Sequence, residues 1–151
     1  MKSQTTLKDN NHRGFSLIEI MIGMAVISLI FLAGYFTSTD SFSRELIISE
    51  NLTLVSVLQK ARNSAMNNIY AHPHGVHIEE DAYVIFRVSP YDTNEPTNER
   101  IPRNSKIAIS GLEEVIFAQL SGEPDRVGDF IVSDGLRTKK VSVIKGGLIS
   151  W

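Results

Sequence analysis

The sequence predicts an α+β protein in which one long N-terminal helix is followed by a small antiparallel β-sheet. The first observation is an unbroken apolar run from Phe15 to Phe36. The second is a stripe of apolar residues at helical spacing between Leu46 and Tyr70. The third is the change to alternating, strand-like patterning after Gly75. A length of 151 residues suits one domain in addition to the N-terminal segment.

The apolar run has the length of a membrane span. Its 22 residues would form a helix of about 33 Å, which is enough to cross the hydrocarbon core. Lys2, Lys8 and Arg13 precede it, and basic residues mark the cytoplasmic side of a span. We therefore expect a single-pass inner-membrane protein with a cytoplasmic N-terminus and an extracytoplasmic body.

Glu19 is the unusual residue of this run. A carboxylate in hydrocarbon costs about 2.5–3.5 kcal/mol, so it is expected to have a partner. A secretory signal peptide would need a small-residue cleavage site after the run, and residues 32–39 offer a poor one. A cut before the run, after Gly14, would instead keep the helix and make Phe15 the new N-terminus. A plain anchor with an accidental Glu19 predicts no such cut.

The segment Gly14-Phe15-Ser16-Leu17-Ile18-Glu19 resembles the class III signal of type IV prepilins and pseudopilins. The resemblance implies that a prepilin peptidase cuts after Gly14 and methylates the amine of Phe15. It also implies that Glu19 faces the Phe15 ammonium of a neighbouring subunit in a filament, where low polarity strengthens the pairing. Many pilins carry a proline near the end of the membrane helix, but this chain has none between Gly14 and Pro73.

These observations divide the chain into a leader (1–14), a membrane helix (15–36), its extracytoplasmic continuation (37–71) and a sheet domain (72–151). We expect Gly34 to bend the helix, and Asp40 and Ser41 to cap a restart after a loosened stretch at 37–39. A soluble coiled coil is the alternative for the second half, but its stripe is too short and interrupted. The stripe consists of Leu54, Val57, Leu58, Ala61, Ala65 and Ile69.

Seven strands are expected after His72-Pro73 ends the helix. The polar, proline-containing stretch 89–105 is expected to be a long loop. Because the chain ends within a predicted strand, we expect Trp151 to be packed. The strands are 75–78, 82–88, 106–109, 114–120, 129–133, 140–144 and 148–151.

A long helix followed by a small sheet is the pilin architecture. The segments 58–65, 130–132 and 140–149 resemble the H-type pseudopilin and FimT-like minor pilin group. This resemblance implies a minor subunit of a type II secretion pseudopilus; the alternatives are a type IV pilus minor pilin and a DNA-uptake pilin. The implied partners are other pilins through the helix, the prepilin peptidase, the inner-membrane assembly platform and membrane lipid.

The charge distribution argues against nucleic acid as a partner. The net charge is −2, and the leader with three cations and one acidic residue carries +2, which leaves −4 for the rest. Arg137, Lys139 and Lys140 form a small basic patch that would hold DNA phosphates weakly. Against an acidic body, we favour a solvated turn over a DNA site.

The sequence predicts neither an enzyme nor a metal or cofactor site. His72, His74, His77 and Glu79 are zinc-ligand types, but their spacing matches no known site geometry. The three acidic residues Asp125, Asp129 and Asp134 lack the order of a calcium-binding loop, and we favour solvation. Ser133-Asp134-Gly135 lacks the glycine before the serine that a nucleophile elbow needs. The chain contains no cysteine, which excludes a catalytic thiol.

Overall fold

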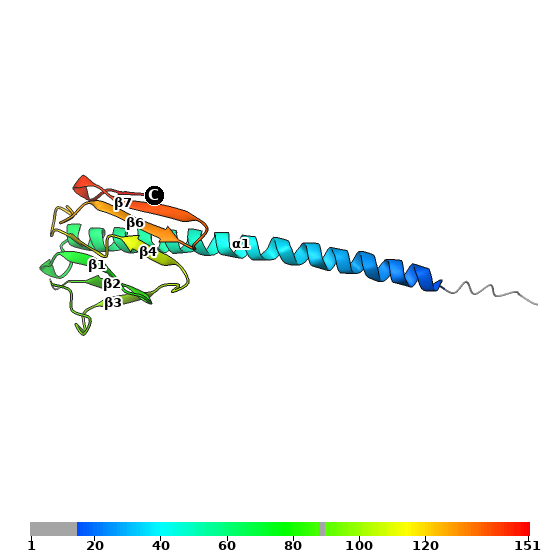
Figure 1. Ribbon diagram of the computed structural model, residues 1–151. Coiled ribbons are helices and arrows are strands. Elements are labelled where there is room, and N and C mark those ends of the chain that lie inside the picture. The colour runs from blue at the N-terminus through cyan, green and yellow to red at the C-terminus, as the bar shows by residue number, and fades with distance from the viewer. Residues whose placement is uncertain (1–14, 88–89) are drawn as a thin grey trace, which may run out of the picture. The chain divides into compact units, whose positions relative to one another are not determined.

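The computed structural model describes residues 15–87 and 90–151, with the side chains of 35–43 excepted. The predicted leader, residues 1–14, lies outside the described residues. The chain divides into two compact units, Met1–Asp40 and Ser41–Trp151. The predicted α+β class is confirmed, with one long helix followed by antiparallel strands (Figure 1).

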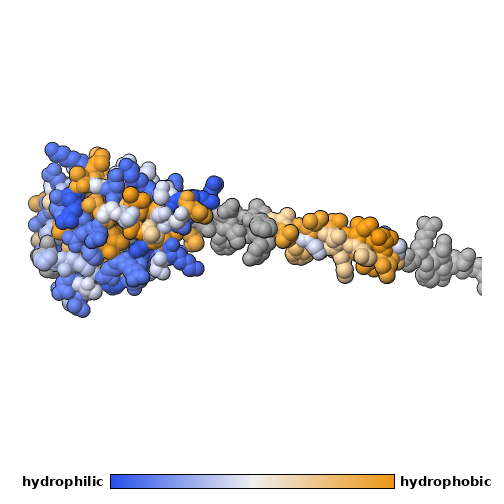
Figure 2. Space-filling model, viewed as in Figure 1, coloured by the Kyte–Doolittle hydropathy of each residue, from blue (hydrophilic) through white to orange (hydrophobic). Residues whose placement is uncertain are grey.

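The helix α1 (Leu17–Met66) has 50 residues. It runs through the stretch 37–41 without a break, so the predicted loosening and capped restart are wrong. No proline interrupts this segment, and each added residue extends a helix at little cost once it has been nucleated. Among the described residues, Leu17–Gly34 is the one segment with the length and composition of a membrane span. Figure 2 shows this segment as a nearly continuous hydrophobic surface.

The helix ends earlier than expected, at Met66 rather than before Pro73. Asn68 adopts a left-handed conformation with φ of 55°, which asparagine tolerates better than most residues. A 3₁₀ turn, η1 (Ile69–Ala71), follows. Ile69 is 41% exposed and does not extend the buried stripe. The other five predicted stripe residues, from Leu54 to Ala65, are buried as expected.

The strands form two four-stranded antiparallel sheets rather than the one small sheet expected. The first sheet has the order β3-β2-β1-β5, and the second has the order β4-β6-β7-β8. The bounds of the first are β1 (His74–Ile78), β2 (Ala82–Phe86), β3 (Glu99–Pro102) and β5 (Glu114–Phe117). Those of the second are β4 (Ala108–Gly111), β6 (Gly128–Ser133), β7 (Thr138–Val143) and β8 (Ile149–Ser150).

Two predictions about the body are wrong. The strand β3 lies inside the stretch expected to be a loop. It is an edge strand, which is where a proline such as Pro102 is tolerated because an edge leaves some N–H positions unused. Trp151 follows the last strand and is 62% exposed rather than packed.

The core of the body lies between the second half of α1 and both sheets. The helix contributes residues three and four positions apart, which places them on one face. Tyr83 and Ile85 of β2 and Phe130 of β6 meet this face. The buried cluster consists of Ile47, Leu54, Val55, Val57, Leu58, Ala61, Ala65, Val76, Tyr83, Ile85, Ile107, Val115, Phe117, Phe130, Val132, Val141 and Val143.

Candidate functional site

The described residues of the predicted processing and assembly site are Phe15, just before α1, and Glu19, in the first turn of α1. The backbone N–H of Glu19 donates to the Ser16 carbonyl at 3.0 Å, so Glu19 lies in the first helical turn. The side chain of Phe15 is 78% exposed. Within residues 15–87 and 90–151, no ion-pair partner of the Glu19 carboxylate is found. Gly14 lies outside the described residues.

The first half of α1 presents apolar side chains on all sides. None of the candidate span is buried in the monomer, and its large apolar residues from Leu17 to Leu32 are about half to four-fifths exposed. A helix that is hydrophobic all round is stable only in lipid or among other apolar surfaces. Carboxylates in such apolar surfaces are rare, and they pair with other charged groups.

A buried polar network in the body was not predicted from the sequence. Tyr83 Oη donates to Glu50 Oε1 at 2.6 Å, and Arg103 Nε lies 3.9 Å from the same oxygen. The backbone N–H of Asn104 donates to Glu50 Oε2 at 3.3 Å. Burial, followed by the hydrogen bond to Glu50, raises the pKa of Tyr83 well above its ordinary value.

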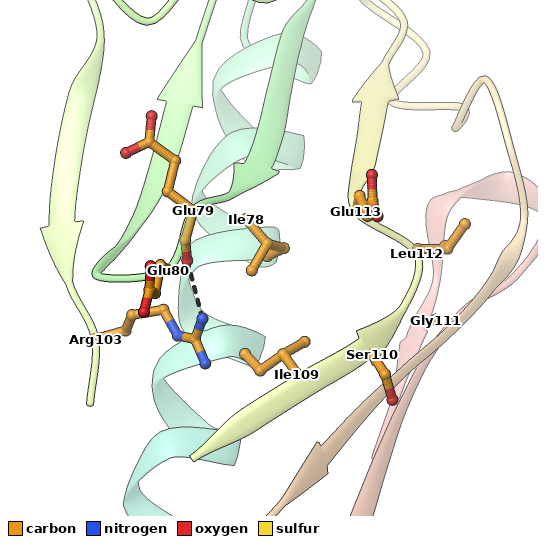
Figure 3. Close-up of a pocket in the computed structure, with 9 residues that line it drawn as sticks. All are labelled: Ile78, Glu79, Glu80, Arg103, Ile109, Ser110, Gly111, Leu112 and Glu113. Atoms are coloured by element: carbon orange, nitrogen blue, oxygen red, sulfur yellow. Dashed lines mark hydrogen bonds between the residues drawn. The ribbon is translucent and has the colours of Figure 1, made fainter. Parts of the chain in front are cut away.

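Arg103 links this network to the ends of the two sheets. Its Nη1 donates to the Glu79 carbonyl oxygen at 2.9 Å, and its Nη2 donates to the Ile107 carbonyl oxygen. Figure 3 shows the guanidinium extending from the end of β3 into a cleft whose far wall is the segment from Ile109 to Glu113. The cleft has a volume of about 380 Å³. Because protein groups already engage Arg103 there, its role is to tie α1 to the strand ends.

The histidines do not converge on a metal site. His74 is buried, and its Nδ1 lies 3.1 Å from the His72 carbonyl oxygen. His77 Nδ1 lies 3.2 Å from Glu114 Oε2, and its ring stacks on Tyr91 at 4.1 Å between centroids. Glu79 is engaged by Tyr91 and Arg100. Over the part of the chain that the structure describes, no group of three acidic, histidine or cysteine side chains is placed to hold a metal.

The three aspartates also lie apart, each with its own partner. Asp125 Oδ1 accepts from the Ile116 backbone N–H at 2.8 Å. Asp129 accepts from the Ser142 hydroxyl at 2.6 Å and lies 3.3 Å from Lys140 Nζ, and these contacts lower its pKa. Backbone N–H groups of the β6–β7 turn lower the pKa of Asp134. The three carboxylates therefore serve local hydrogen bonds in turns and strands.

The three residues of the predicted basic patch, Arg137, Lys139 and Lys140, have different surroundings in the structure. Lys140 is paired with Asp129 on the second sheet. Arg137 Nη1 lies 4.0 Å from Asp134 Oδ2. Arg137 and Lys139 instead line a cleft with Arg44 of α1. Arg44 lies too far away in sequence for spacing to have suggested this neighbourhood.

The comparisons with known proteins agree with the N-terminal signal. A family model described as the prokaryotic N-terminal methylation motif matches residues 9–35. The chain carries this methylation motif. The match spans the residues on both sides of Gly14 together with most of the apolar segment. No curated protein matches the chain, and no solved structure matches it.

The methylation motif is the signal of type IV pilin-like proteins, and it indicates a precursor that a prepilin peptidase processes. A signal of this kind implies assembly with other pilins in general. The apolar helix following the motif is consistent with membrane anchoring. The match ends at residue 35, within the apolar segment.

Proposed function

We propose that this protein is a minor pilin-like subunit that is cut after Gly14, methylated at Phe15 and assembled through α1. The observation that carries the proposal is the methylation motif over residues 9–35, joined to a span whose apolar side chains are exposed. In the uncut precursor, such a helix can span the bilayer. After assembly it can pack among the helices of other pilins.

Glu19 has the assembly role in this proposal. A buried ion pair is tolerated only when both charges are matched and hydrogen-bonded. The Phe15 ammonium of a neighbouring subunit would supply the match once the leader is removed. A Glu19 carboxylate buried in the filament without this ammonium would be costly. Glu19 would therefore fix the axial position of each added subunit relative to its neighbour.

The machine we propose is a type II secretion pseudopilus, with this chain as an H-type subunit. Support comes from the similarity of segments 58–65, 130–132 and 140–149 to that group and from the two-sheet body packed on α1. A type IV pilus minor pilin is the alternative with the same processing. A DNA-uptake role has less support because Lys140 is paired with Asp129 and the body is acidic.

Secretion assays test the choice of machine. Deletion of the gene should abolish export of type II substrates and leave twitching and DNA uptake intact, and the wild-type chain should restore export. Loss of twitching with normal export would identify a pilus subunit instead. Loss of transformation, together with a gel shift of duplex DNA by the purified full chain, would identify a DNA-uptake pilin.

A further inference from the structure

An open strand edge borders the cleft that Arg103 enters. The strand β4 lies at the edge of the second sheet, beside β6, and its other side lines this cleft of about 380 Å³. Figure 3 shows the residues from Ile109 to Glu113 along one wall and Glu79 and Glu80 along the other. We call this space the β4 cleft.

Two residues of β4 turn their backbone groups away from β6. The residues of an antiparallel pair alternate between positions that hydrogen-bond across the pair and positions that do not. The N–H of Leu112 donates to the Asp129 carbonyl oxygen at 3.0 Å, which places Ser110, two residues earlier in the ladder, at a bonded position. The N–H and C=O groups of Ile109 and Gly111 therefore point away from β6.

Arg103 shows that this side of the strand can accept hydrogen bonds. Ile107 lies two residues before Ile109 and points the same way, and its carbonyl oxygen accepts a hydrogen bond from Arg103 Nη2. In the part of the body that the structure describes, Ile109 and Gly111 have no such partner. Gly111 is exposed, and Ile109 is half-buried. The edge of β4 therefore offers a short row of unused donors and acceptors.

The other three sheet edges are protected. The strand β3 contains Pro102 and β8 has only two residues, and both features make an edge a poor template. The strand β5 is covered, because Asp125 donates its N–H to the Ile116 carbonyl oxygen at 2.8 Å and accepts the Ile116 N–H through Oδ1 at 2.8 Å. By contrast, β4 contains neither a proline nor a charged residue between Ala108 and Gly111. An open edge of this kind can pair with another strand.

The walls of the β4 cleft favour a single extended segment as its occupant. Because Glu79 and Glu80 face β4 across the cleft, the edge of a folded sheet from a second copy would meet this wall. A single strand has side chains that alternate between two faces. On one face they would pack against Ile78 and Ile109, which are partly buried against the core. On the other face they would lie at the rim of the cleft.

The charges at the rim favour a basic segment. Glu79 already has an ion-pair partner in the body, and the charge of Arg103 is offset by Glu50. Glu80 and Glu113 are both exposed, and the ion pairs among residues 15–87 and 90–151 include neither of them. A segment with lysine or arginine at alternate positions would complement these two carboxylates, as charges across protein interfaces do.

We propose that the β4 cleft binds a basic, extended segment of a partner protein, which pairs with Ile109 and Gly111 as an added strand. Main-chain hydrogen bonds would supply the affinity, and the alternating side chains would supply the preference for basic sequences. A loop or a chain terminus of the partner can provide such a segment. The proposal goes beyond the proposed function, because it needs neither cleavage after Gly14 nor a filament.

Fluorescence anisotropy with the full chain in a non-ionic detergent tests the proposal. The first probe is a labelled octapeptide in which valine and lysine alternate, and the second has glutamate in place of lysine. The lysine peptide should bind, and the glutamate peptide should not. Two further forms of the lysine peptide carry methyl groups on every second backbone nitrogen, starting from the first or from the second residue. Because an added strand pairs along one edge, one methylated form should bind about tenfold more weakly and the other should change much less.

Two pairs of variants test the residues of the cleft. E80Q/E113Q removes the rim charges and should weaken binding of the lysine peptide about tenfold, which is about threefold for each charge. Its matched control, E45Q/E123Q, removes two exposed carboxylates outside the cleft and should bind normally. Ile109→Pro removes an N–H that the pairing with β6 does not use, and it should weaken binding about tenfold. Ile109→Val keeps this N–H and should bind normally.

The methylated peptides and E80Q/E113Q decide the question even if Ile109→Pro fails to fold. The proposal would be overturned if the lysine peptide did not bind at millimolar concentration, if the lysine and glutamate peptides bound equally, or if the two methylated forms bound equally. Equal losses in E80Q/E113Q and E45Q/E123Q would also overturn it. A dimer of the chain that Ile109→Pro abolishes, with no peptide binding, would assign the edge to a second copy instead. Because the test needs no filament, its failure would leave the proposed pilin-like function standing.

Discussion

Tyr83 of β2 donates a buried 2.6 Å hydrogen bond to Glu50 of α1. The two residues are 33 positions apart, and both are shielded from solvent. Arg103 provides the counter-charge to Glu50 and continues to the Glu79 and Ile107 carbonyl groups. A buried charge such as that of Glu50 is stable only where it is paired and hydrogen-bonded. The network therefore fixes how the helix lies on the first sheet.

The Tyr83→Phe substitution tests this network. It removes the hydroxyl donor and keeps the ring, so the hydrogen bond to the charged Glu50 is lost without a cavity. We expect the free energy of unfolding to fall by about 1.5–3 kcal/mol, the range for hydrogen bonds to charged groups. Chemical denaturation of the purified protein measures the change. The control is Tyr91→Phe, because Tyr91 donates to the more exposed Glu79, and its loss should be smaller. Equal losses would contradict a special role for Tyr83.

Gly75 is expected to tolerate no side chain. A Cβ built at this position in β1 would overlap the ring of Phe86 on β2, and Phe86 is buried. We expect Gly75→Ala to destabilise the body by about 1–3 kcal/mol, as overpacking does. Thermal unfolding of Gly75→Ala, Phe86→Leu and the double variant tests the cause. The double variant should be more stable than the sum of the two single losses predicts; strict additivity would show that the Phe86 ring is not the obstacle.

His74 should make stability decrease as the pH falls below about 6.5. Burial lowers the pKa of His74, whereas in the unfolded chain the pKa is near its ordinary value of about 6.5. The unfolded state then binds more protons as the pH falls below about 6.5, so stability decreases on acidification. We expect His74→Gln to flatten this part of the profile, measured by denaturation at several pH values. The exposed His72 is the control, and a slope unchanged in His74→Gln would refute the assignment.

A second loss of stability is expected at lower pH. The hydrogen bond from Arg100 lowers the pKa of Glu79, and the pKa values of Asp129 and Asp134 are lowered by their own donors. Carboxylates with lowered pKa values stabilise the folded state above their ordinary range and lose that contribution as they are protonated. This loss falls below about pH 4.5, so it is separate from the effect of His74.

Glu19→Gln should permit processing but impair assembly. The substitution removes the charge that we pair with the Phe15 ammonium and leaves the size and polarity of the side chain similar. Cross-linking of neighbouring subunits in cells should show a strong loss of assembled species with normal levels of the mature protein. Glu45→Gln is the control, since Glu45 is an exposed carboxylate on α1 beyond the candidate span. Normal assembly of the Glu19→Gln variant would contradict the proposed role of Glu19 in assembly.

The local pattern of apolar and polar residues was sufficient to predict the long helix and most of the strands. The spacing of Leu54, Leu58, Ala61 and Ala65 placed the buried face of α1 correctly because helical periodicity is a property of neighbouring residues. The strand β3 was missed because the residues of β2 that pair with it lie 14 to 20 positions away, from Ile85↔Glu99 to Ala82↔Pro102. Its sequence, which includes Pro102, is also unlike a typical strand.

The contacts between distant segments could not be predicted in the same way. Glu50, Tyr83 and Arg103 are ordinary residues in their local sequence, and only the packing of α1 on the first sheet makes them a network. Arg44 and Lys139 are likewise brought to one cleft by the fold. By contrast, the N-terminal signal is a contiguous segment, so it was recognisable from the sequence and a family model matched it independently.

The most direct test of the central claim is the intact mass of the membrane-extracted protein, together with its N-terminal sequence. The measurement is made in cells with and without a prepilin peptidase. The account predicts a peptidase-dependent N-terminus at Phe15, with the added mass of one methyl group on its amine. An N-terminus at Met1 in both strains, or a cut beyond Gly34, would contradict it and leave a simple anchored or secreted domain.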